Sequence, residues 1–169
     1  MGETIMSCKI IDMSIKELLD HRRRMARNSK RESCRNLARF LDIFPVFLKA
    51  SAEREEPFTR EELRKFEYYD YLVSRLHPKH RDPITKRGER HVRKIMLDGF
   101  YLYRDIKKNG LKNPLQMYQT ERGIPRMSRG GRRLMILDML GYKTVPVMMH
   151  DSRQEMLDDK TDWSWKKEV

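Results

Sequence analysis

The segment from Asn109 to His150 constrains the fold of this 169-residue chain more than any other part. Short apolar runs alternate there with turn-forming residues, a pattern that predicts strand, strand, helix and strand in that order. The turn before the expected helix reads Ser128, Arg129, Gly130, Gly131, Arg132 and Arg133. Two glycines at a helix start, beside three arginines, favour a site for an anion such as phosphate.

The apolar spacing around these glycines predicts a small mixed structure. We expect strands over residues 114–118, 124–127 and 145–149, and helices over residues 92–106 and 131–140. Asn109-Gly110 favours the left-handed conformation that ends a helix. Pro146 has no backbone N–H, so it favours a sheet edge or a strand start for the last strand.

Two capping boxes mark helix starts in the first half of the chain. Ser14 is followed three residues later by Glu17, and Thr59 by Glu62. In such a pair each side chain can accept a hydrogen bond from the backbone N–H of the other residue. A helix is therefore expected after Ser14 and another after Thr59.

Periodicity and turn residues complete the expected organisation. Residues 32–49 predict a helix that Pro45 breaks or kinks, and the aromatic residues over 66–71 have a spacing more typical of packing than of base stacking. Prolines, a glycine and many charges over 77–88 predict a loop. We expect a helical region over 1–80, an α+β domain over 81–150 and a charged tail over 151–169.

The order of motifs in the second half resembles the N-terminal domain of the ParB and sulfiredoxin-like superfamily. The resemblance covers roughly residues 90–150 and is carried by three groups of residues. They are Asn109, Gly110, Leu111, Pro114 and Leu115; Gly130, Arg132, Arg133 and Leu134; and Leu140, Gly141, Val145, Pro146 and Val147.

This resemblance implies an α+β fold, a small mixed sheet with packed helices, that binds nucleotide phosphates at the Gly-x-Arg-Arg turn. It also implies a nucleoside triphosphate with Mg²⁺ as a candidate cofactor. The superfamily includes CTP-binding partition proteins, ATP-using sulfinic acid reductases, free-serine kinases and nucleases, so the fold alone does not choose a reaction.

The chain departs from two branches of this superfamily. Partition proteins usually carry Gly-Glu-Arg-Arg, whereas Gly131 stands here in place of the glutamate. The sulfiredoxin branch needs a cysteine beside the glycines, and Cys8 and Cys34 lie far from them in the sequence. These departures favour phosphate binding over either chemistry.

Positive charge is concentrated before and within the glycine turn. The net charge is +12, and residues 76–133 alone carry 16 Lys and Arg against five Asp and Glu. Such a segment attracts nucleic acid, although a solvated basic surface gives the same count. The candidate nucleic-acid contacts are Arg87, Arg90, Arg93 and Lys94.

Other features indicate a cytoplasmic protein without a metal site. The two cysteines lack the spacing of metal ligands and are expected to be reduced thiols. No signal peptide and no apolar run of about 18 residues are found, so no membrane partner is expected. His77, His80 and His91 fit solvated histidines better than metal ligands, because no cysteines or carboxylates accompany them at suitable spacing.

Four carboxylates are candidates for Mg²⁺ binding or general-base chemistry, but their spacing selects none of them: Asp98, Asp105, Glu121 and Asp138. We therefore name no catalytic residue. The favoured hypothesis is a ParB-like protein that binds a nucleotide or nucleic-acid phosphate at residues 128–133, in association with DNA. The alternative is a basic nucleic-acid-binding module without catalysis, and a ParB-like nuclease or small-molecule kinase comes third.

Overall fold

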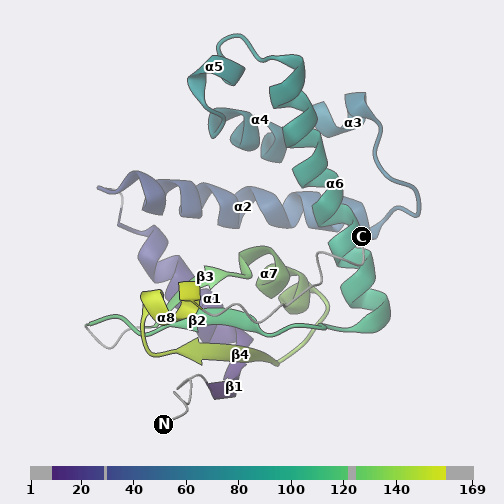
Figure 1. Cartoon of the computed structure of the whole chain (residues 1–169). Coiled ribbons are helices and arrows are strands. Elements are labelled where there is room, and N and C mark those ends of the chain that lie inside the picture. The colour runs from purple at the N-terminus through teal and green to yellow at the C-terminus, as the bar shows by residue number, and fades with distance from the viewer. Residues whose placement is uncertain (1–8, 29, 122–124, 159–169) are drawn as a thin grey trace. The chain divides into compact units, whose positions relative to one another are not determined.

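The structure, a computed structural model, describes residues 9–28, 30–121 and 125–158 (Figure 1). The chain forms two compact units, one made of residues 1–19 and 109–169 and the other of residues 20–108. Helices and a four-stranded mixed sheet make up the described residues, which confirms the expected α+β class. The tryptophans of the charged tail lie outside the described residues.

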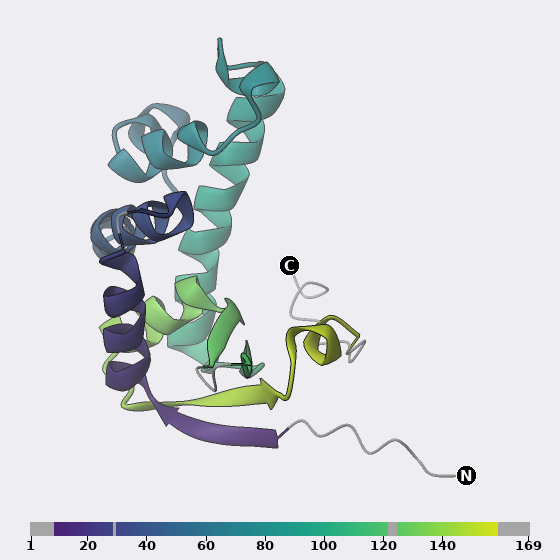
Figure 2. The same ribbon diagram turned by 90° about the vertical axis from the view of Figure 1, so that its left-hand side faces the viewer.

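The first unit is built on the sheet, whose strand order is β1-β4-β2-β3 (Figure 2). The strands are β1 (Lys9–Ser14), β2 (Leu115–Tyr118), β3 (Arg126–Arg129) and β4 (Thr144–His150). β4 pairs antiparallel with β1 and parallel with β2, and β2 pairs antiparallel with β3. Two further helices, α7 (Gly131–Met139) and α8 (Arg153–Asp158), belong to this unit.

Burial that alternates along β2 and the first part of β4 places one apolar face of these strands in the core, and residues 147–150 of β4 are all buried. Leu115, Met117, Val145 and Val147 are buried, as two-residue periodicity requires. Residues 133–137 of α7 are also all buried. The expected strand, strand, helix and strand are thus present, and Gly110 ends the preceding helix at φ +76°.

β4 differs from its expected place. It lies inside the sheet, because β1, which sequence periodicity did not indicate, adds to its other side. The parallel pairing with β2 starts only at Val147. Pro146 therefore lies where β4 has a neighbouring strand on one side alone, which accommodates a residue without an N–H.

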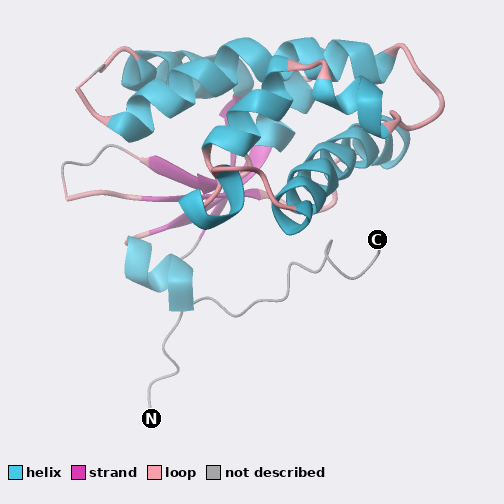
Figure 3. Ribbon diagram, turned by 90° about the horizontal axis from the view of Figure 1, so that it is seen from above, coloured by secondary structure: helices cyan, strands magenta, loops and turns pink. Residues whose placement is uncertain are grey.

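The second unit is helical (helices cyan in Figure 3). Its elements are the second half of α1 (Ile15–Ala26), α2 (Glu32–Ala52), α3 (Arg60–Arg64), α4 (Glu67–Ser74), α5 (Pro78–Arg81) and nearly all of α6 (Lys86–Asn109). Phe44, Phe47, Tyr68 and Phe100 are almost completely buried in its aromatic core. The prediction that the aromatic residues over 66–71 pack is confirmed for Tyr68, Tyr69 and Tyr71, which are all buried.

Both predicted helix starts are found. Ser14 accepts a hydrogen bond from the Glu17 N–H, and Thr59 and Glu62 form a complete capping box. The helix after Thr59, α3, is shorter than expected. Phe66 adopts an extended conformation, and a separate helix, α4, begins at the next residue. α2 runs through Pro45, which lies on the exposed side, where water can hydrate the carbonyl that loses its partner.

The expected boundary near residue 80 lies inside the helical unit. Residues 77–88 form a hydrogen-bonded corner, because the Thr85 hydroxyl contacts His80 Nδ1 and accepts from the Gly88 N–H. A Cβ on Gly88 would lie 2.7 Å from the His80 carbonyl oxygen. This close packing joins α5 to α6. The chain instead crosses between the units within α1, after Leu19, and at the end of α6, after Lys108.

Candidate phosphate-binding sites

The first candidate site is the turn between β3 and α7. Gly130 adopts φ +119°, a conformation that L side chains rarely take, and it precedes the first residue of α7. A Cβ at Gly130 would lie 2.6 Å from Leu115 Cδ2 on β2. Glycine is thus required at this position for two reasons: the positive φ disfavours other residues, and Leu115 of β2 leaves no room for a Cβ.

The start of α7 has no side-chain cap, because Gly130 occupies the N-cap position. The first intrahelical bond runs from the Leu134 N–H to the Gly130 carbonyl, at 2.8 Å. Backbone N–H groups at a helix start point along the axis and carry partial positive charge, so they can bind an anion. Gly131, the first helical residue, has no side chain to obstruct that approach.

The arginines of the turn have different surroundings. Arg133 is buried, and its Nη1 donates to the carbonyl oxygens of Asn113 at 3.0 Å and Pro114 at 3.4 Å. Burial lowers the pKa of Arg133 to about 10, and the nearby charge of Arg132 adds to the shift. Arg133 therefore connects α7 to the segment that precedes β2. The side chain of Arg132 is less buried than that of Arg133.

The remaining members of the predicted set, Ser128 and Arg129, end β3, and Arg129 pairs with Gln116 of β2. Their side chains lie outside what the structure describes. The turn thus brings together an uncapped helix start, Gly131 and Arg132, with Arg133 directed into the unit.

The second candidate site is the basic surface of α6, which we define by the exposed cations Lys86, Arg87, Arg90 and Lys94. Arg87, Arg90 and Lys94 have the i, i+3, i+7 spacing of one helical face. Arg93, also predicted as a nucleic-acid contact, is half-buried, and its Nε has no hydrogen-bond partner among the described residues.

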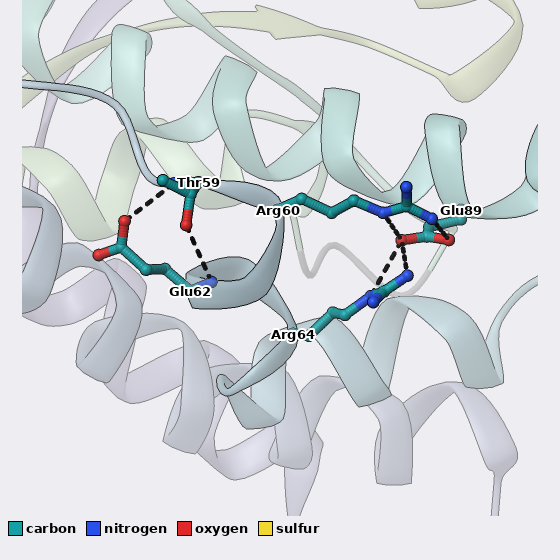
Figure 4. A network of polar contacts seen from close by, with 5 residues as sticks. All are labelled: Thr59, Arg60, Glu62, Arg64 and Glu89. Atoms are coloured by element: carbon teal, nitrogen blue, oxygen red, sulfur yellow. Dashed lines mark hydrogen bonds and ion pairs between the residues drawn. The ribbon is translucent and has the colours of Figure 1, made fainter.

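The acidic residue on this part of α6 is already neutralised (Figure 4). Glu89 is buried and accepts two hydrogen bonds from Arg60, each at 2.8 Å, and two from Arg64, at 3.0 and 2.6 Å. The bonds from Arg60 are the main cause that lowers the pKa of Glu89 to about 2. This ion-pair group was not predicted, because 25 to 29 residues separate its members.

Desolvation and, to a smaller extent, neighbouring cations affect the pKa of His80, near the start of α6. Its pKa lies below the ordinary value, first because the ring is desolvated and then because of the charges of Lys79, Arg87 and His77. Cations that accumulate without carboxylate partners repel a further proton. The same field attracts phosphate groups.

Among the described residues, no three His, Cys, Asp or Glu side chains gather as a metal site. Asp98 and Asp138, two of the carboxylates considered for Mg²⁺, are exposed on α6 and α7. Both sites described above instead offer N–H groups and guanidinium groups, which are ligands for anions.

Comparison of the chain with family models, with curated proteins and with solved structures finds no match. None of the helices in the described part of the chain is both long and apolar enough to span a membrane.

Proposed function

We propose that this protein binds a phosphate group of a nucleotide or nucleic acid at the turn between β3 and α7. The observation that supports this best is Gly130 at φ +119°, which leaves the start of α7 without a side-chain cap. A phosphate oxygen can accept hydrogen bonds from these backbone N–H groups and is favoured by the helix dipole.

In this proposal the two arginines of α7 have separate roles. Arg132 supplies a guanidinium group to the phosphate, in a planar geometry that suits its oxygens. Arg133 connects the start of α7 to the segment before β2, because it donates to the carbonyl oxygens of Asn113 and Pro114. A nucleoside triphosphate would arrive with its Mg²⁺ bound to its own phosphates, and we assign no protein ligand to that ion.

Isothermal titration of the full chain with ATP, CTP and GTP, each with Mg²⁺, tests the proposal. Arg132→Ala should weaken binding at least tenfold, because it removes a charge-assisted contact. Arg153→Ala, an exposed arginine of α8 in the same unit, is the matched control and should leave affinity unchanged. Absence of binding by the wild type, or equal affinity of the Arg132→Ala variant, would contradict the proposal.

A second function, nucleic-acid binding without catalysis, is supported by the basic surface of α6. Within the described part of the chain, its exposed cations form no ion pair with a carboxylate, while the nearby Glu89 is bonded to two arginines. Binding to phosphates releases counterions, so affinity for an oligonucleotide should fall steeply as salt rises. Fluorescence anisotropy over 50–200 mM salt measures this slope, and a flat dependence would exclude the function.

A further inference from the structure

We propose that Arg60 and Arg64, held in place by Glu89, bind backbone phosphates of a nucleic acid and extend the basic surface of α6 onto α3. The inference rests on the second function proposed above and assigns residues that are distant from that surface in the sequence. Glu89 is a positioning residue in this arrangement, and the two arginines are the contacts.

The geometry directs the carboxylate inward and the guanidinium groups outward. The side chain of Glu89 is 8% exposed, whereas those of Arg60 and Arg64 are 48% and 44% exposed. Arg60 uses Nε and Nη2 on the carboxylate, and its Nη1 has no hydrogen-bond partner among the described residues. One edge of this guanidinium group is thus available to an acceptor from solution.

The charge of the group is not balanced within it. Two guanidinium groups share one carboxylate, and Glu61 is a further acidic neighbour of Arg60. On α6, Lys86 and Arg93 lie three residues before and four residues after Glu89, which places them on neighbouring turns of the same face. Both residues carry a positive charge, so cations flank Glu89 on this face of α6.

The extent of the cations favours a nucleic-acid backbone over a single phosphate. Lys86 and Lys94 are eight residues apart on α6, a rise of about 12 Å. Arg60 and Arg64 add two further cations on α3, where both bond to Glu89 of α6. A nucleic acid presents phosphates repeatedly along such a length, whereas one phosphate group would engage only part of it.

Glu89 lowers the entropic cost of binding. A free arginine side chain loses rotamer freedom when a phosphate immobilises it. The four hydrogen bonds to Glu89 already fix both guanidinium groups in the unbound protein (Figure 4). Positioning of this kind favours arginine over lysine, because it uses the planar fork of donors.

The substitution Glu89→Gln separates positioning from net charge. It removes a negative charge. If only the net charge of the surface mattered, the variant would bind an oligonucleotide more tightly than the wild type. If Glu89 positions the arginines, binding should instead weaken about three- to tenfold in fluorescence anisotropy, at a fixed salt concentration. Tighter binding by a folded Glu89→Gln variant would overturn the proposal.

Arg60→Lys provides a second test that keeps the charge and replaces an exposed side chain. It should weaken oligonucleotide binding severalfold, while Arg23→Lys, an exposed arginine of α1 also paired with one carboxylate, should not. Arg60→Gln and Arg64→Gln should each lower the salt slope by about 0.7 to 0.9, one phosphate contact each. Wild-type slopes in both variants would overturn the proposal.

Inorganic phosphate and ATP serve as the probes for a free phosphate. We expect both to compete with the oligonucleotide only at millimolar concentrations; competition at micromolar concentration would overturn the assignment to a nucleic-acid backbone. If the wild type binds no oligonucleotide, the function of the α6 surface fails together with this inference. If Arg87→Gln and Arg90→Gln weaken binding but the Arg60 and Arg64 variants do not, this inference alone fails.

Discussion

Gly130 satisfies two requirements that can be separated by substitution. Gly130→Ala should lower the free energy of unfolding by about 2–5 kcal/mol, because it combines a strained positive φ with overpacking against Leu115. Gly141→Ala is the matched control: Gly141 has φ +85° but no atom within 4 Å of an added Cβ. Gly141→Ala should lower the free energy of unfolding only by the cost of the strained positive φ, about 1 kcal/mol. Urea denaturation of both variants measures the difference, and equal losses would contradict the steric argument.

Arg132 and Arg133 are adjacent in sequence but differ in what they contact. Arg133→Ala should lower the free energy of unfolding by about 1–3 kcal/mol, since the carbonyls of Asn113 and Pro114 lose a charged donor. Arg132 is half-buried rather than buried, so Arg132→Ala should lower the free energy of unfolding by less than Arg133→Ala does. Thermal and urea denaturation test this pair, and a reversed order of stabilities would show that the roles are exchanged.

The sequence identifies the arginine-rich turn but cannot separate these two residues. Residues 133–137 are all buried, so α7 has no exposed face along this stretch that periodicity would reveal. Gly130 was predictable as a conformationally special residue. Its contact with Leu115 was not, because it depends on the pairing of β2 with β3.

Among the elements, α3 and α6 are joined by an ion pair whose strength depends on pH. The folded-state pKa of Glu89 is about 2, below its ordinary value of 4.5. A lowered carboxylate pKa stabilises the fold fully above the unfolded value, and this stabilisation is lost as pH falls from about 4.5 to 2. Glu62, bonded to Arg54, has the same dependence, with a pKa of about 2.

Comparison of Glu89→Gln with the wild type isolates one of these groups. At pH 7 the variant should be less stable by about 1–3 kcal/mol, the range for hydrogen bonds to charged groups. The difference should shrink towards pH 2, where the wild type also loses the ionised carboxylate. Urea titrations at pH 7, 4 and 2.5 measure it, and a difference that stays constant would exclude this linkage.

Local signals predicted elements well, while contacts between distant elements were not predictable. The helix starts at Ser14 and Thr59 were predicted from residues three positions apart, and both helices begin where expected. The addition of β1 to β4 joins residues more than 120 positions apart. The ion pairs of Glu89 likewise need the tertiary structure, so sequence periodicity could indicate neither feature.

At the scale of the whole molecule, most of the excess positive charge belongs to the helical unit. Residues 20–108 contain 24 Lys and Arg against 14 Asp and Glu, a net charge of +10. Residues 1–19 and 109–169 together carry only +2, although they contain the glycine–arginine turn. The concentration of charge predicted over residues 76–133 therefore combines two surfaces that belong to different units.

This distribution predicts that nucleotide and nucleic-acid binding respond to different substitutions. If the turn holds a nucleotide and the basic surface of α6 holds a nucleic acid, Arg132→Ala should weaken binding of a nucleoside triphosphate at least tenfold and change oligonucleotide affinity less than twofold. Arg87→Gln with Arg90→Gln should do the reverse and lower the oligonucleotide salt slope by up to about 2, because each lost phosphate contact removes nearly one unit. Titration calorimetry with the triphosphate and anisotropy with the oligonucleotide, on the same three proteins, compare the two effects. If Arg132→Ala weakens both ligands equally, a single phosphate site serves them both, and the basic surface of α6 has no separate function.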